Sequence, residues 1–169
     1  MPLCETRADR ELLLTFFLTF ARFEYALKAS GLFKRPNRHR NDVSRPPEAH
    51  PDWDTFAVSL RGLFRTDKTE SLKSACEYIL DCPPWKQVII NDGIAWETPV
   101  RPQQEWDIKF ILRMVRCVRN NLFHGGKYNF DVHEDTARTE RLLSSSLTVL
   151  KECLDLAPAV KREFDDATI

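Results

Sequence analysis

The sequence of 169 residues is poor in glycine, and its cysteines form no recognisable pattern. Five glycines are too few for a chain built mainly of tight turns and short strands, so a barrel is disfavoured. The cysteines are Cys4, Cys76, Cys82, Cys117 and Cys153. Their spacing fits no zinc site, and an odd, scattered set predicts reduced thiols in a cytoplasmic protein.

Net charge and long apolar runs are also missing. The 25 Lys and Arg residues balance 25 Asp and Glu residues, so any contact with RNA must come from a local patch. No run of about 18 apolar residues predicts a membrane helix, and no secretory signal is visible. The P-loop, GxGxxG, HExxH, GxSxG and paired-carboxylate motifs are absent, which removes most standard enzyme classes. We expect no membrane partner, cofactor or metal.

What the chain does have is helical periodicity. Hydrophobic residues make up 43%, including 11 Phe and 4 Trp, which is enough for a core. Apolar residues recur every three or four positions in 9–30, 52–64, 69–80, 104–123 and 134–156. Segments 86–90 and 94–98 predict a β-hairpin, with Asp92-Gly93 supplying its turn. We therefore predict one all-α domain over 1–169, a bundle of four to five helices with one inserted hairpin.

Two polar segments interrupt this pattern. Residues 34–47 form a basic, proline-containing loop after Gly31, the predicted stop of the first helix. Such a loop can follow a polyanion backbone, although a charge run is more often simply solvated. Residues 157–169 form a charged tail, which we expect to fray.

One carboxylate occupies an apolar face. Glu24 belongs to the stripe of the first predicted helix that also contains Leu13, Phe17, Phe20 and Leu27. A carboxylate in apolar surroundings is costly unless it is paired. Glu24 either forms a surface pair with Lys28, four residues on, or bonds an Arg or His of the later helix.

The most informative stretch is 119–127, with the sequence RNNLFHGGK, at the end of the predicted helix 104–123. One interpretation is a C-terminal helix cap, because basic side chains and glycine are favoured there. Consecutive asparagines weaken this interpretation, because Asn is a mediocre helix former. The other is a phosphate site, in which Arg119 binds phosphate oxygens and His124 transfers a proton near neutral pH.

Helical geometry groups these residues. At about 100° per residue, Arg116, Asn120 and His124 share one face, and Arg119 borders it. Arg119 and His124 themselves lie roughly 140° apart around an ideal helix. A turn at Gly125-Gly126, or a second subunit, must therefore bring the two side chains together.

Arg119-x4-His124, at the end of a helix in a small all-α protein, resembles the RX4-6H signature of the HEPN superfamily. The longer string VRNNLFHGGK over 118–127 is more specific than the bare motif. The segment FFLTFARFEYALK over 16–28 resembles the first helix of a plasmid-encoded bacterial HEPN branch, and the hairpin and following helix fit that branch too. The likeness extends from residue 16 to about residue 154.

The resemblance implies a helical bundle that forms a homodimer, with the two motifs facing one cleft. It implies a metal-independent endoribonuclease, a toxin or phage-defence effector, with RNA as substrate. Arg119 and His124 would be the catalytic residues. The supporting or substrate-binding residues would be Asn120, Arg116, Glu24 and Lys127. Any antitoxin or regulatory protein would be a separate chain.

Two alternatives stay open. The chain can be a non-catalytic HEPN module that binds a nucleotide or RNA, which the neutral net charge favours mildly. It can also be a structural dimerisation or adaptor protein. In that case Arg119 and His124 only cap and brace the end of the helix.

Overall fold

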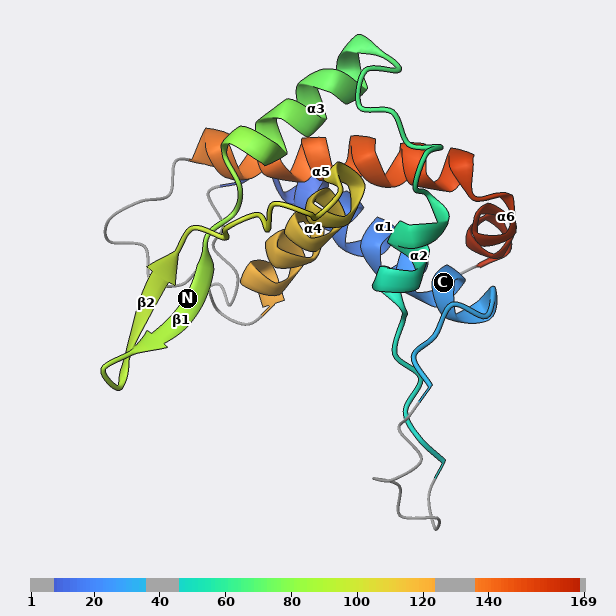
Figure 1. The fold of residues 1–169 in the computed structure, drawn as a ribbon, viewed down its shortest axis with the longest axis horizontal. Coiled ribbons are helices and arrows are strands. Elements are labelled where there is room, and N and C mark those ends of the chain that lie inside the picture. The colour runs from blue at the N-terminus through green and yellow to red at the C-terminus, as the bar shows by residue number, and fades with distance from the viewer. Residues whose placement is uncertain (1–7, 36–45, 124–135, 168–169) are drawn as a thin grey trace.

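The computed structural model describes residues 8–35, 46–123 and 136–167. These residues form six α-helices and one two-stranded antiparallel sheet (Figure 1). The predicted mainly-α class is confirmed, and the number of helices exceeds the predicted four to five. The elements in chain order are α1 (Arg10–Ala29), α2 (Trp53–Ser59), α3 (Glu70–Asp81), β1 (Lys86–Ile90), β2 (Gly93–Glu97), α4 (Asp107–Phe123), α5 (Thr136–Leu156) and α6 (Pro158–Asp166).

Polar caps set the ends of the first three helices. The Asp9 side chain accepts hydrogen bonds from the first backbone N–H groups of α1, Asp52 does so for α2, and Thr69 does so for α3. Each cap satisfies a donor that the helix itself leaves unpaired. After α1 the backbone enters the left-handed region at Gly31, where φ is 89°, so the predicted stop is confirmed.

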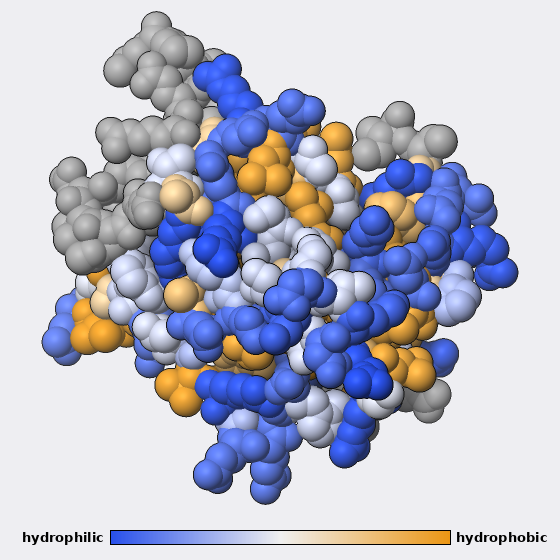
Figure 2. All heavy atoms as spheres, turned by 90° about the horizontal axis from the view of Figure 1, so that it is seen from above, coloured by the Kyte–Doolittle hydropathy of each residue, from blue (hydrophilic) through white to orange (hydrophobic). Residues whose placement is uncertain are grey.

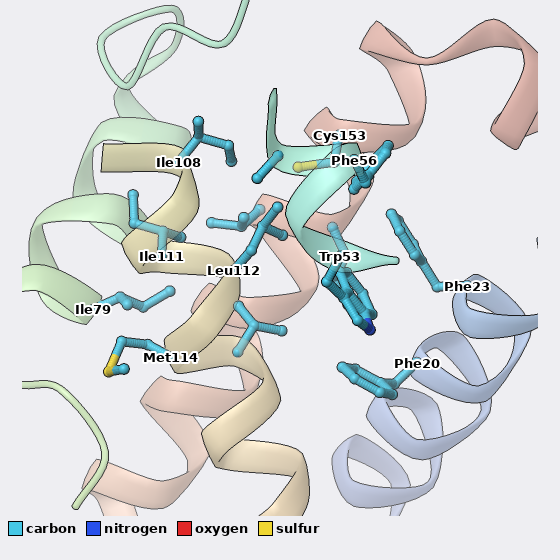
Figure 3. Close-up of a cluster of buried hydrophobic side chains, with 14 of the residues drawn as sticks. Phe20, Phe23, Trp53, Phe56, Ile79, Ile108, Ile111, Leu112, Met114 and Cys153 are labelled. Carbon is cyan, nitrogen blue, oxygen red and sulfur yellow. The ribbon is translucent and has the colours of Figure 1, made fainter. Parts of the chain in front are cut away.

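The helices pack around α5, which runs across the molecule with α3 beside it (Figure 1). Helices α1, α4 and α6 also contact α5, and α2 contacts α4. Four aromatic residues join α1 to α2 in the core (Figure 3): Phe20, Phe23, Trp53 and Phe56. The Trp53 ring stacks on Phe23 with centroids 5.3 Å apart and on Phe20 at 5.4 Å, which fixes the position of the short α2.

The expectation of a fraying tail over 157–169 is wrong, because α6 begins at Pro158. Proline is tolerated in the first turn of a helix, where its missing N–H group is not needed. Val160 is buried, and Phe164 meets the edge of the Phe23 ring at 6.5 Å. The Arg22 guanidinium covers Phe164 from the other helix at 4.6 Å. Two apolar residues one turn apart therefore attach this charged segment to α1.

Two further boundaries differ from the prediction. Helix α2 ends at Ser59 instead of residue 64, and the chain turns at Gly62, where φ is 80°. The hairpin turn is formed by Asn91 and Asp92, with φ of 48° and 60°, while Gly93 belongs to β2. A two-residue turn of this type needs positive φ at both positions, and Asn and Asp are the non-glycine residues that tolerate it best.

The face shown in Figure 2 is mostly hydrophilic, with apolar residues reaching it at separate places. The hairpin projects from the helices (Figure 1) and exposes Ile89 and Ile94, which face each other across its strands. A second group of exposed apolar side chains lies on α1. Within the described ranges, no helix combines the length and the apolar character needed to cross a membrane.

Candidate functional site

The candidate site lies where the C-terminal end of α4 meets α1. Nη2 of Arg119 lies 3.7 Å from Oε2 of Glu24, and both side chains are partly exposed. Of the two partners that the sequence left open for Glu24, the structure shows the one on the later helix. No ion pair joins Glu24 to Lys28 in the described part of the chain. The pair connects segments far apart in sequence, so it depends on the packing of α4 against α1.

Trp53 holds the Glu24 carboxylate from the core side. Its indole Nε1–H donates to Oε1 of Glu24 at 3.2 Å, while the other carboxylate oxygen faces Arg119. A buried tryptophan needs an acceptor for this N–H group, and here the acceptor is a carboxylate. Sequence reasoning did not place Trp53 in the site. The signal in the sequence was a tryptophan on an apolar helix face, whose N–H group needs a partner.

Aromatic rings surround the Arg119 guanidinium. Its central carbon lies 5.7 Å from the centroid of the Phe20 ring and 5.2 Å from that of Phe123. Phe123 is in turn 5.0 Å from Phe17 of α1. Ring faces attract a cation and orient a planar guanidinium. The rings therefore form an aromatic cluster beside Arg119 that extends from the buried Phe20 to the exposed Phe123.

Most hydrogen-bond donors of Arg119 are not engaged within the described residues. Nη1 donates to Oδ1 of Asn120 at 3.1 Å, whereas the 3.7 Å separation from Glu24 is longer than a hydrogen bond. A guanidinium carries five N–H donors. Among the described residues, Arg119 thus contacts one carboxylate, one amide and two rings, and these contacts leave most of its donors unused.

The two adjacent asparagines differ in their contacts. Nδ2 of Asn121 donates to the Trp85 carbonyl at 2.7 Å, and the Cys117 thiol lies 3.5 Å from the same oxygen. These contacts attach the segment before β1 to the last turns of α4. Asn120 is exposed, and its amide oxygen accepts from Arg119, while its N–H groups have no acceptor among the described residues.

The other predicted site residues fall into two groups. Arg116 lies one helical turn before Arg119–Asn120, is partly exposed, and has no ion pair or hydrogen bond with the described residues. His124 and Lys127 lie outside the described residues, as does the central part of the basic loop, 36–45. The sequence places His124 directly after Phe123, and its role stays a prediction.

The cysteines within the described ranges are reduced thiols: Cys76, Cys82, Cys117 and Cys153. Burial raises the pKa of the Cys76 thiol from 9.0 to about 12. Burial also raises the pKa of Cys153 well above its ordinary value. Both thiols therefore stay protonated at neutral pH and act as apolar core groups rather than nucleophiles.

A separate open pocket of about 440 Å³ lies at the other end of α4. Its walls include Arg61 and Trp106, and the Arg61 guanidinium lies 3.8 Å from the centroid of the Trp106 ring. The predicted site residues do not line it. The candidate site is therefore defined by the contacts of Arg119 and not by this cavity.

Comparison of this chain with models of protein families, with curated proteins and with solved structures finds no match. The fold and the geometry at Arg119 therefore carry the functional argument. The HEPN resemblance stays a prediction drawn from the residues of the motif.

Proposed function

We propose that this chain is a metal-independent endoribonuclease of the HEPN type, with an HEPN-like helical bundle, which acts as a toxin or phage-defence effector. The observation that supports it most is the state of Arg119. The residue contacts Glu24, Asn120 and two aromatic rings, and within the described part of the chain most of its donors have no acceptor. A preorganised guanidinium of this kind suits the phosphate of an RNA backbone.

In the proposed reaction the RNA supplies its own nucleophile. The 2′-oxygen attacks the adjacent phosphorus, the bond from phosphorus to the 5′-oxygen breaks, and the products are a 2′,3′-cyclic phosphate and a 5′-hydroxyl end. His124 accepts the proton of the 2′-hydroxyl or donates one to the leaving 5′-oxygen. Two copies of the chain supply one histidine for each step.

Arg119 and Asn120 then act on the charge of the transition state. Negative charge builds up on the phosphoryl oxygens, and donors already aimed at them stabilise it without reorganisation. The guanidinium of Arg119 and the amide of Asn120 belong to the same end of α4. Glu24 holds the guanidinium in position from α1. This chemistry requires no metal ion.

The test is RNA cleavage in the presence of EDTA. Purified protein should cut RNA and leave cyclic phosphate ends, whereas the Arg119→Ala/His124→Ala double variant should not. Arg113→Ala is the matched control, because it removes a similarly exposed arginine from the same helix. Equal cleavage by the double variant, or none by the wild type at high enzyme, would contradict the proposal.

The open donors of Arg119 also favour one second candidate, a module that binds RNA or a nucleotide without cutting it. A preorganised guanidinium binds a phosphate whether or not a histidine moves a proton. This candidate predicts binding that Arg119→Ala removes and no turnover by the wild type. Measuring RNA binding beside cleavage separates the two.

A further inference from the structure

The open pocket of about 440 Å³ lies between the chain segment that follows α2 and the start of α4. Its lining residues belong to the ranges 61–67 and 106–108. Phe64, Trp106 and Ile108 supply apolar surface, and Arg61 is one of its charged groups. A cavity of this volume is large enough for a small organic molecule.

Hydrogen bonds hold both walls of this pocket in place. In the segment after α2, the N–H group of Phe64 donates to the Leu60 carbonyl at 3.0 Å. In the segment before α4, the Arg101 guanidinium donates twice to the Glu105 carbonyl, at 2.7 and 3.0 Å, and also pairs with Asp107. The chain's own contacts therefore fix the walls.

Arg61 differs from most arginines that cover aromatic rings in this structure. Its guanidinium carbon lies 3.8 Å from the centroid of the Trp106 ring, the shortest such distance among the described residues. Arg22 and Arg138 also cover rings, but each donates to a backbone carbonyl as well. The Arg61 side chain has no hydrogen-bond acceptor and no ion-pair partner in the described part of the chain. Stacking therefore orients the guanidinium, while its in-plane N–H donors are left for another group.

The two carboxylates that line the pocket are each paired with another arginine. Arg65 donates to both oxygens of Asp67 at 3.3 Å, and Arg101 pairs with Asp107. Because these two pairs are neutral, Arg61 carries the uncompensated charge of the pocket. It attracts one negative group on a ligand. A second negative charge would lose water without gaining a free cation, so the pocket favours a monoanion.

We propose that this pocket binds a small organic carboxylate, with the acid group on Arg61 and the apolar body against Phe64, Trp106 and Ile108. A carboxylate is planar and carries one charge, so it matches the guanidinium fork with two parallel hydrogen bonds. A phosphate monoester fits the same fork but brings a second charge. The inference does not rest on the proposed function, because the pocket and Arg119 lie at opposite ends of α4.

Three matched probes test the ligand class. Phenylacetate, phenylacetamide and phenyl phosphate share a phenyl ring and carry one, no and nearly two negative charges at neutral to mildly basic pH. Phenylacetate should bind with a Kd of about 1 mM or below, as suits a ligand of this size, and at least tenfold more tightly than the other two. Calorimetric titration and the NMR signal of the Trp106 indole N–H group measure this. A Kd above about 10 mM for phenylacetate, or a preference below tenfold over either probe, would overturn the proposal.

Variants of Arg61 test the residue that carries the site. Arg61→Gln should weaken phenylacetate binding at least tenfold with unchanged helical content, and Arg61→Lys, which keeps the charge but not the planar fork, should weaken it less. Arg141→Gln is the matched control, because that guanidinium also covers a ring, Tyr78 at 4.5 Å, but lies outside the pocket. A loss below tenfold for Arg61→Gln, or an equal loss for Arg141→Gln, would contradict the site. Carboxylate binding by a protein that cuts no RNA contradicts only the proposed function, and RNA cleavage without carboxylate binding contradicts only this pocket.

Discussion

The two halves of α4 each place an arginine beside a carboxylate and an aromatic ring, but they engage the arginine differently. Nη2 of Arg113 lies 2.7 Å from Oε2 of Glu105 and also 3.3 Å from the Val100 carbonyl. Nη2 of Arg119 lies 3.7 Å from Glu24. The exposed fractions of the two arginines are nearly equal, 39% and 34%. Exposure alone therefore does not separate them.

The two pairs differ in how closely the carboxylate contacts its arginine. Glu105 is only 9% exposed, lies in the segment just before α4, and binds Arg113 closely, so the pair is closed. Glu24 comes from another helix, uses one oxygen to accept from Trp53, and lies 3.7 Å from Arg119, beyond hydrogen-bond distance. A closed pair braces a fold, whereas an open pair can exchange part of its contact for an incoming anion. The longer distance between arginine and carboxylate, more than the residue types, favours the Arg119 end of α4 as the site.

The largest effect is expected from the two arginines themselves. Arg119→Ala should lower RNA cleavage by about 100- to 1,000-fold, the usual loss when a charge-stabilising donor is removed. Arg113→Ala should leave cleavage within about twofold but lower stability by roughly 1–3 kcal/mol, because Glu105 loses its partner. Cleavage rates and urea unfolding of the two variants provide the measurement. Equal losses of activity in both variants would contradict the claim that only Arg119 acts in the site.

Substituting the two carboxylates should have smaller effects of the same kind: Glu24 should affect cleavage, and Glu105 should affect stability. Glu24→Gln keeps an oxygen that accepts from Trp53 but removes the charge beside Arg119, so cleavage should fall roughly tenfold with little change in Tm. Glu105→Gln removes the charge from the closed pair, so Tm should fall while cleavage persists. Single-turnover rates and thermal scans test this pair. A Glu24→Gln variant that cleaves normally would show that Arg119 needs no anchor.

The two asparagines should differ in the same way: Asn121 should affect stability, and Asn120 should affect RNA binding. Asn121→Ala removes the donor to the Trp85 carbonyl and should cost about 1 kcal/mol of stability. Asn120→Ala removes an exposed amide and should weaken RNA binding a few-fold without changing Tm. Chemical unfolding and RNA titration distinguish the two. A stability loss for Asn120→Ala equal to that for Asn121→Ala would assign both amides to the fold.

The smallest effect concerns the cap of α2, the helix that carries Trp53. The N–H group of Thr55 donates to Asp52 and, with the Thr55 hydroxyl and the Lys34 charge, lowers the pKa of that carboxyl below its ordinary 3.8, against an opposing effect of burial. Because the folded pKa is the lower one, the stabilisation is present above about 3.8 and is lost as the pH falls through the folded value. The Tm difference between wild type and Asp52→Ala should therefore be a few degrees at pH 7 and shrink at acid pH. A gap that does not change with pH would contradict this.

Sequence periodicity predicted most of the fold for physical reasons. The helices α1, α3, α4 and α5 carry long apolar stripes, and α1 and α3 also have side-chain caps. Helix α6 was missed because its only large apolar residues are Val160, which is buried, and Phe164, which packs on the distant Phe23. The position of the hairpin turn depended on local backbone conformation at Asn91-Asp92, which composition does not determine.

The site was only partly predictable. A carboxylate on an apolar face predicted that Glu24 needs a partner, but the choice between Lys28 and a later helix depended on how α1 packs against α4. Trp53 contributes through a contact between helices that no local pattern reveals. Asn120 and Asn121 are chemically identical, and only their different positions around α4 direct one to Trp85 and the other to the surface.

The most direct test of the central claim measures RNA binding in a background that cannot cut. In a His124→Ala protein, adding Arg119→Ala should weaken RNA affinity at least tenfold and lower the slope of log Kd against log salt concentration by about one, the signature of one lost phosphate contact. Adding Arg113→Ala instead should change neither quantity. Equal weakening by both substitutions, or by neither, would contradict the assignment of the open Arg119 pair as the anion site.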